Sequence, residues 1–294
     1  MINPELENKV ILITGANHGI GAATAMKLAA QGAKVFISYF TSPSKLTENQ
    51  LSLAVKKGIG GEALYTALQQ QPGEKIVSEI KQEGGIAACL EIDLGFTKNI
   101  PKLFDYCERQ FGLVDILIIN HTHEEFDTFD INSVGGIEFP VAPVSVETID
   151  RHLAVNARAG ALMIEEFTLR FLKRNPEWGR IISLTTTRAH GLNISYAASK
   201  QALVSYTLSA AAELGKYGIT ANVVCPGATQ TGYISPEGEE SLAKRTPLGR
   251  IGLPDDIADV VVFLASKQSH WLTGNIVYAA GGFNVPNFLG QSIF

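Results

Sequence analysis

The sequence has little of what marks secreted, membrane-spanning or nucleic-acid-binding proteins. It has three cysteines among 294 residues, an odd number without paired spacing, which predicts reduced thiols and not a disulfide framework. The net charge is −5, so the chain lacks the basic surface that binds nucleic acid. No apolar run reaches the roughly 18 residues that a membrane helix needs. We therefore expect no nucleic-acid or membrane partner.

The first residues also lack the layout of a signal peptide. The stretch Met1–Lys9 is acidic and leads directly into an apolar run, whereas a signal peptide begins with basic residues followed by a longer apolar segment. Together with the unpaired cysteines, this start favours the cytoplasm as the compartment.

Apolar runs of strand length alternate with helix-periodic segments along the whole chain, and 46% of the residues are hydrophobic. Such alternation implies right-handed βαβ crossovers and a parallel sheet covered on both faces. We predict one α/β domain over residues 1–294, with a Rossmann-like, doubly wound sheet of seven parallel strands. The expected strands are 10–13, 34–38, 86–92, 114–119, 180–184, 220–225 and 275–278.

Two stretches are longer than a βαβ unit requires, at about 41–71 and 122–144. The first contains three glycines and the weakly helical run Glu62–Leu68, and the second is acidic with several phenylalanine and isoleucine residues. Loops of this length inside a compact domain are usually functional or mobile. We therefore expect both insertions to border the functional site.

A glycine-rich loop, Thr14–Gly21, joins the first strand to the first helix. Gly15, Gly19 and Gly21 permit a tight turn and let the backbone approach a pyrophosphate, to which the helix N-terminus presents free N–H groups. The alternative is a turn that binds nothing, since glycine patterns alone are weak evidence. The position directly after the first strand favours dinucleotide binding.

The second motif is a tyrosine four residues before a lysine, Tyr196 and Lys200. On a helix this spacing places both side chains on one face. A nearby ammonium stabilises a phenolate, so we expect Lys200 to lower the pKa of Tyr196 towards the range of a useful acid–base group. A solvated surface pair is the alternative that the spacing alone leaves open.

Together, the glycine-rich loop and the Tyr-x-x-x-Lys pair resemble the short-chain dehydrogenase/reductase family, over about residues 8–284. The resemblance implies a nicotinamide-dependent interconversion of a carbonyl and a secondary alcohol, in the manner of 3-oxoacyl-carrier-protein reductases or broad-specificity relatives. Enoyl reduction is disfavoured, because relatives with that chemistry place the tyrosine and lysine further apart. The cofactor contacts that the resemblance implies are Gly15, Asn17, His18, Gly19, Ile20, Gly21, Tyr39, Asp93, Leu94, Asn120, Tyr196, Lys200, Pro226, Gly227, Thr229 and Thr231.

The resemblance also implies catalytic roles. Tyr196 would exchange the hydroxyl proton, Lys200 would hold the nicotinamide ribose, and Asn156 would fix a water that links Lys200 to solvent. The family's catalytic serine aligns with Thr186, which keeps the hydroxyl that polarises the carbonyl. The loop before Tyr196 is shorter than usual, so Thr185 and Ser183 remain alternatives.

One departure from the family concerns the segment after the fourth strand. His121 and Thr122 replace the two small residues that let the cofactor lie close, while Asn120 is kept. His121 and His123 invite a metal hypothesis, but no third ligand has suitable spacing, and we expect no metal. His190 is a further candidate for substrate contact or for the surface.

The choice of cofactor depends on the end of the second strand. NAD-binding folds place an acidic residue about 20 positions beyond the glycine motif, and here Tyr39 stands in that place. Without a carboxylate, the 2′-phosphate of NADP meets no repulsion, so we expect NADP to be preferred and NAD to remain possible. Donors for the phosphate could come from His18, Ser42, Ser44 and Lys45, and the competing interpretation is an acid delivered by the insertion, Glu48 or Glu62.

Two further expectations concern partners. The rival to an enzyme is a cofactor-binding sensor or assembly protein with weak or no turnover, which the altered segment at His121 favours and the intact Tyr196 and Lys200 oppose. We also expect a homo-oligomer, in the form of a tetramer, because apolar residues occur on more than one face of the helices that carry Asn156 and Tyr196. The apolar tail 283–294 would reach across a subunit.

Overall fold

A computed structural model describes residues 3–133, 139–174, 178–186 and 192–283. Its centre is a seven-stranded sheet in the order β3-β2-β1-β4-β7-β8-β9, with every neighbouring pair parallel. The predicted single-domain, doubly wound α/β fold is confirmed. The strands are β1 (Val10–Thr14), β2 (Lys34–Tyr39), β3 (Ile86–Glu91), β4 (Ile116–Ile119), β7 (Gly179–Leu184), β8 (Ile219–Pro226) and β9 (Ile276–Ala279).

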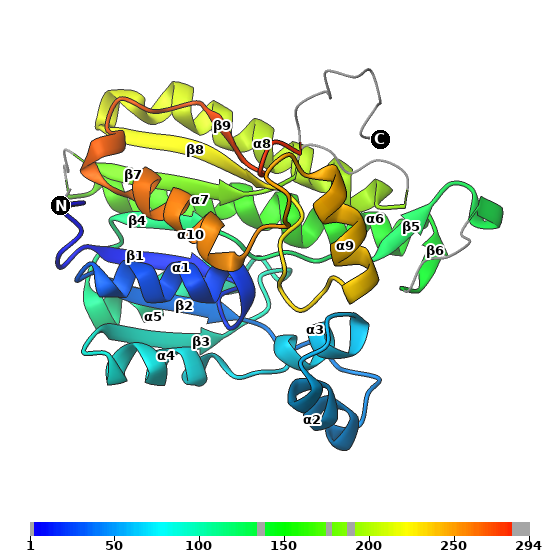
Figure 1. Ribbon diagram of the computed structural model, residues 1–294. Helices are drawn as coiled ribbons and strands as arrows, with labels where there is room; N and C mark the ends of the chain where they lie inside the picture. The colour runs from blue at the N-terminus through cyan, green and yellow to red at the C-terminus, as the bar shows by residue number, and fades with distance from the viewer. Residues whose placement is uncertain (1–2, 134–138, 175–177, 187–191, 284–294) are drawn as a thin grey trace.

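Helices cover both faces of the sheet (Figure 1). On one face lie α1 (Gly19–Ala30), α4 (Gly73–Gln82) and α10 (Pro254–Ala265), and on the other α5 (Asn99–Phe111), α7 (Ala159–Leu172) and α8 (Ile194–Leu214). Because the strands are buried on both sides, their side chains are apolar without alternation, and burial of these side chains supplies most of the driving force for folding. No helix in the described ranges is long and apolar enough to span a membrane.

The first insertion folds into two short helices, α2 (Glu48–Lys57) and α3 (Glu62–Gln69). Thr47 begins α2 with a capping box, and Gly58 ends it with a φ of 63° that favours glycine. The amide of Gly61 donates to the carbonyl of Gly232, 2.9 Å away, so α3 is fastened to the segment that follows β8.

The second insertion forms a small parallel pair, β5 (Phe126–Thr128) and β6 (Val141–Pro143), followed by α6 (Val146–His152). Asp127 is fully buried, and its carboxylate accepts hydrogen bonds from the amide and the hydroxyl of Ser195, in the first turn of α8. The insertion therefore stabilises the N-terminus of the helix that carries Tyr196.

Both insertions lie at the edge of the sheet to which the strands point, together with α9 (Pro236–Arg245) (Figure 1). At this edge β1 lies between β2 and β4, where the chain changes direction across the sheet. Open parallel sheets bind their ligands at such a switch point, outside the carboxyl ends of the strands. The fold thus places both insertions beside this switch point, where we expect the functional site.

Candidate active site

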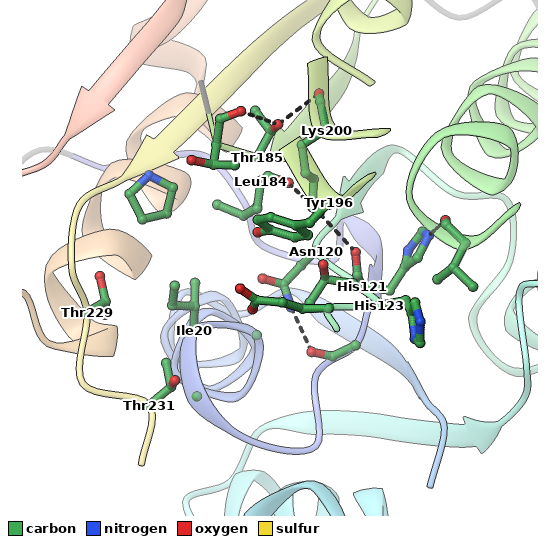
Figure 2. A pocket seen from close by; sticks show the side chains of 18 of the residues that line it. Ile20, Asn120, His121, His123, Leu184, Thr185, Tyr196, Lys200, Thr229 and Thr231 are labelled. Atoms are coloured by element: carbon green, nitrogen blue, oxygen red, sulfur yellow. Dashed lines mark hydrogen bonds between the residues drawn. The ribbon is translucent and has the colours of Figure 1, made fainter. Parts of the chain in front are cut away.

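A cavity of about 650 Å³ lies at this switch point. It runs from the glycine-rich loop and the end of β2, past β4, to Tyr196 and Lys200 on α8. Figure 2 shows Tyr196 and Lys200 projecting into it from α8, with Ile20 and Thr231 on the other side. All sixteen predicted cofactor contacts and Thr186 line this cavity, so residues from across the sequence meet in one place.

The glycine-rich loop fits closely under its neighbours. Gly15 and Gly19 have φ angles of 64° and 57°, which side chains rarely adopt. A Cβ on Gly15 would lie 2.7 Å from the Cα of His121, and a Cβ on Gly21 would collide with the carbonyl oxygen of Gly15. Helix α1 begins at Gly19 with no side-chain cap, which leaves its first N–H groups for a ligand.

Asn120 stabilises the glycine-rich loop through hydrogen bonds. Its Nδ2 donates to the carbonyl oxygens of Thr14 and Gly15, at 3.1 and 2.7 Å, and its own amide donates to the Thr14 hydroxyl. These bonds tie the end of β4 to the start of the glycine-rich loop. The end of β4 is therefore held against the glycine-rich loop, although His121 stands where the family has a small residue.

Lys200 is buried, and its ammonium donates to the carbonyl oxygens of His121 and Leu184, both 3.3 Å away. Burial lowers the pKa of Lys200 to about 8, and the negative charge of Glu124 acts in the opposite direction. Lys200 is held at the point where β4, β7 and α8 converge.

Tyr196 does not have the lowered pKa that its spacing from Lys200 suggests. Burial is the main cause that raises the pKa of its phenol well above the usual value, and the nearby carboxylate of Glu124 adds to it, while a hydrogen bond with Thr122 opposes it. The Lys200 ammonium lies 5.9 Å from the centre of the Tyr196 ring. The expectation of a lowered pKa is wrong for the protein without cofactor, and Tyr196 is a protonated phenol at neutral pH.

Of the three candidate hydroxyls, those of Thr185 and Thr186 belong to residues that line the cavity, and Ser183 does not line it. Ser183 is fully buried and bonds to Thr207 at 2.8 Å on the covered side of β7. Thr185 lines the cavity, but its hydroxyl donates to the Lys200 carbonyl at 3.0 Å (Figure 2). Thr186 is half-buried at the cavity wall.

Asn156 lies behind the cavity and not on its wall. Its Oδ1 accepts from the His123 amide at 2.7 Å, and its Nδ2 donates to the His123 carbonyl at 2.8 Å and to the Ser199 hydroxyl at 3.0 Å. It lies in a π-helical turn, Leu153–Arg158, a distortion that is frequent at functional sites. Both Nδ2 hydrogens are used by protein groups, so Asn156 positions the segment after β4, and a water-holding role stays a prediction.

Of the two histidines considered for a metal, His121 has both ring nitrogens hydrogen-bonded to the protein, whereas the buried Nε2 of His123 has no hydrogen-bond partner in the described part of the chain. His121 pairs with the Thr14 hydroxyl at 2.7 Å and the Val155 carbonyl at 2.9 Å, one through each ring nitrogen. Burial lowers the pKa values of His121 and His123 to about 4, so both rings are neutral at pH 7. The described ranges contain no group of three metal-ligating side chains. His190 lies outside the described residues.

Models of known protein families match almost the whole chain. The family model described as short chain dehydrogenase matches residues 9–58, and the model described as enoyl-(acyl carrier protein) reductase matches residues 57–284. The chain belongs to the short-chain dehydrogenase/reductase family. It is therefore an oxidoreductase of a family that uses NAD or NADP, and the residues on the cavity wall fit that cofactor.

The similar proteins align over almost their whole length. An uncharacterized oxidoreductase, YjdA of Bacillus subtilis, is 31% identical, with 94% of this chain and 97% of the relative covered. Versicolorin reductase stcU of Emericella nidulans is 33% identical, with 95% and 97% covered. Among solved structures, the reductase LugOII, which catalyses keto-reduction in lugdunomycin biosynthesis, superposes with a TM-score of 0.75 at 30% identity, over 95% of this chain and 98% of that one.

At the adenosine end of this short-chain dehydrogenase/reductase, Tyr39 donates its hydroxyl proton to Glu74, 2.8 Å away at the start of α4. Burial and Glu74 raise the pKa of Tyr39 to about 12. Glu48 and Glu62, the acids considered for NAD, are exposed and lie outside the cavity wall.

The donors considered for a 2′-phosphate are only partly in place. His18 and Ser42 line the cavity, whereas Lys45 is exposed and does not. Burial lowers the pKa of His18 to about 4, so its ring carries no positive charge at neutral pH. Any preference for NADP must therefore come from hydroxyl and backbone donors and from the missing carboxylate, and not from a cation among these candidates.

Several residues at the substrate end were not predicted individually. Tyr65 of α3 lines the cavity and packs against the ring of Tyr233, 5.2 Å away, which in turn stacks on Phe139 at 4.5 Å. Glu124 and Asn193 lie beside Tyr196 in the same wall. The sequence marks the insertions that carry most of them, but pairs so far apart along the chain leave no local signal.

Proposed function

We propose that the protein is an NADPH-dependent reductase that converts cyclic aromatic ketones to secondary alcohols. The observation that carries the proposal is the unbroken cavity from the glycine-rich loop to Tyr196, with Tyr65 on its wall and the ring of Tyr233, which stacks on Phe139, packed against Tyr65. Flat apolar walls suit a flat substrate, because aromatic surfaces gain most when they are buried against one another.

The protein's own groups would activate the carbonyl. When bound, the nicotinamide supplies the hydride. Tyr196, protonated at neutral pH, donates its phenol proton to the carbonyl oxygen, and the Thr186 hydroxyl donates a second hydrogen bond to the same oxygen. Lys200 holds a positive charge beside the phenol, where it stabilises the phenolate that remains after transfer. A neutral acid in this position favours the direction of reduction.

The related proteins support a ketone substrate. Hydroxynaphthalene reductase-like protein Arp2 of Metarhizium robertsii is 29% identical over 94% of this chain, and versicolorin reductase 1 of Aspergillus parasiticus is 33% identical over 95%. The structure of the angucycline ketoreductase LanV, at 28% identity and a TM-score of 0.74, contains NADP. The spacing of Tyr196 and Lys200 argues against enoyl reduction, although one matching family model is named for it.

The preference for NADPH is part of this proposal. Its support is the position of Tyr39, where a ribose-binding carboxylate would repel the 2′-phosphate, and the hydroxyl of Ser42 on the same wall. The acids that could reverse the preference, Glu48 and Glu62, do not line the cavity.

The test is a steady-state assay of NADPH oxidation with α-tetralone, a small aromatic ketone, and with acetoacetyl-coenzyme A, a flexible 3-oxoacyl thioester. We expect reduction of α-tetralone with kcat/KM well above that of the thioester, and loss of several orders of magnitude in Tyr196→Phe with cofactor binding intact. Equal or better turnover of the thioester would redirect the assignment to acyl substrates. No reduction of either ketone would contradict the proposed reaction.

A further inference from the structure

Two hydrogen-bond acceptors lie side by side in the cavity, next to Tyr196. The Nδ2 of Asn193 donates to the Oε1 of Glu124 at 3.0 Å, which fixes the orientation of the Asn193 amide. Both residues line the cavity wall, and they come from different segments, one after β4 and one at the start of α8. Neither has a part in the proton transfer described above.

One of the two acceptors lacks a donor. Asn193 Oδ1 is buried and has no hydrogen-bond partner among the described residues. Among the described residues, Asn193 is also the single side chain that donates to the Glu124 carboxylate. A buried acceptor without a donor is costly, typically by about 1–3 kcal/mol, so a site that keeps the Asn193 oxygen unpaired is suited to a ligand that supplies the donor.

The surroundings restrict what that donor can be. Burial raises the pKa of the Glu124 carboxyl, while the positive charge of Lys200 lowers it. Lys200 already compensates the negative charge in this part of the cavity, so an added cation would meet repulsion and would also have to lose its hydration. Tyr65 and Tyr233, whose pKa values Glu124 helps to raise, place aromatic rings around the carboxylate. A neutral donor on an aromatic ring fits all of these neighbours.

We propose that Glu124 and Asn193 form an acceptor subsite that binds a hydroxyl group of the aromatic ketone. This inference rests on the proposed function and names its substrate class as hydroxylated aromatic ketones. The hydroxyl would donate to Glu124 or to Asn193 Oδ1 while the carbonyl oxygen faces Tyr196. A ketone without the hydroxyl would leave Asn193 Oδ1 unpaired, and sites of this kind discriminate more strongly than apolar pockets.

The test compares α-tetralone with its ring-hydroxylated isomers, in the wild-type protein with NADPH. A hydrogen bond to a charged group corresponds to roughly 10–100-fold in an equilibrium constant. We expect one hydroxytetralone to exceed α-tetralone in kcat/KM by a factor in this range. In Glu124→Leu this preference disappears, in Glu124→Gln it shrinks, and in both variants α-tetralone changes less than the hydroxylated ketone.

The matched control is Glu62→Gln, which alters an exposed carboxylate on α3 outside the cavity wall and should keep the wild-type preference. Calorimetry on Tyr196→Phe with NADPH bound, with and without Glu124→Gln, measures the same preference as affinity and does not depend on turnover. An equal loss for both ketones would mean that Glu124 acts on Tyr196 or Lys200, and would overturn the subsite. A wild-type protein that reduces α-tetralone without preferring any hydroxylated isomer would also overturn it while leaving the proposed function standing. Failure to reduce every tetralone would remove both.

Discussion

Lys200 is the residue whose charge depends most directly on pH near neutrality. Its folded pKa of about 8 lies below the ordinary value of 10.5, because burial disfavours the ammonium. Tyr196 keeps its proton over the same range, since its pKa is raised. Raising the pH through 8 therefore removes the positive charge that stabilises the phenolate, and it leaves the proton donor in place.

The corresponding prediction concerns the pH profile. We expect kcat/KM for NADPH, which reports groups of the free enzyme, to be constant below pH 8 and to fall above it. Lys200→Arg should lower activity and abolish the fall in kcat/KM above pH 8, because a guanidinium stays charged. The profile is measured with a ketone at saturation. If the fall above pH 8 persists unchanged in the arginine variant, a group other than Lys200 causes it.

Thr186 provides a second prediction at the residue scale. If its hydroxyl bonds to the carbonyl oxygen, Thr186→Ser should keep or increase kcat, and Thr186→Ala should lose about 2–3 kcal/mol of transition-state stabilisation, on the order of 100-fold in rate. The variants are compared by kcat with α-tetralone. Thr185→Val is the matched control, because the Thr185 hydroxyl already donates to the Lys200 carbonyl. An alanine variant as fast as wild type would move the role to another donor.

A third prediction tests the cofactor at Tyr39. Tyr39→Asp should shift preference from NADPH towards NADH, because a carboxylate there repels the 2′-phosphate and accepts hydrogen bonds from the ribose. Since Glu74 lies 2.8 Å from the Tyr39 hydroxyl, the change is best made together with Glu74→Gln, and Glu74→Gln alone is the control. Calorimetric titration with both nucleotides measures the shift. Tighter NAD binding by the unmodified protein would contradict the assignment of NADP.

At the scale of the elements, β5 and α8 are joined through one buried carboxylate. Asp127 accepts the Ser195 amide at 3.0 Å and lies at the positive end of the α8 dipole. Asp127→Ala should cost about 2–3 kcal/mol of unfolding free energy, because it leaves buried donors unpaired. It should also reduce kcat, since Ser195 directly precedes Tyr196.

Denaturant unfolding and kcat measured on the same samples test this prediction. Asp127→Asn, which keeps an acceptor oxygen, should lose less of both quantities than the alanine variant. Asp150→Asn, an exposed carboxylate on α6, should change neither. An unchanged free energy of unfolding in Asp127→Ala would show that the insertion does not stabilise α8.

The elements also show how far the sequence alone could lead. Buried strands on two faces produce continuous apolar runs, so the sheet was predictable, and the Gly15–Gly21 and Tyr196–Lys200 motifs placed the site. The run Glu62–Leu68 is weakly helical in sequence and forms α3. Its contact with Gly232, however, depends on residues far away along the chain, so the role of Tyr65 in the cavity could not be predicted.

The pKa of Tyr196 could not be predicted for the same reason. The Tyr196–Lys200 spacing gives the neighbouring cation, but it says nothing of burial or of Glu124, which raise the pKa of Tyr196. Local spacing predicts which groups meet, whereas their charge states depend on everything that packs around them.

At the scale of the whole molecule, the apolar surface of the catalytic helices is smaller than the sequence suggested. Phe167 and Leu203 belong to the core, with exposures of 1% and 0%. Leu153, Leu162 and Tyr206 remain exposed, at 40%, 37% and 47%. Single exposed apolar residues are ordinary, but three on adjacent helical segments are consistent with a contact between subunits. The tail 284–294 lies outside the described residues.

We expect a homotetramer in light scattering at micromolar concentration. The double variant Leu162→Glu with Tyr206→Glu should dissociate the tetramer into smaller species. In an isologous interface the same patch of both subunits takes part, so each new charge is present twice in the contact. Leu169→Glu, which is also exposed on α7, is the matched control. A monomeric wild-type protein under these conditions would contradict the prediction.

Helix α3 contacts both ends of the cavity. On one side the Asn17 side chain of the glycine-rich loop donates to the carbonyl oxygens of Gln69 and Gln71, at 3.0 and 2.9 Å, and on the other side Gly61 bonds to Gly232. A displacement of α3 away from the cavity requires these three hydrogen bonds to break. We therefore expect an opening of α3 to accompany the release of a bound nucleotide.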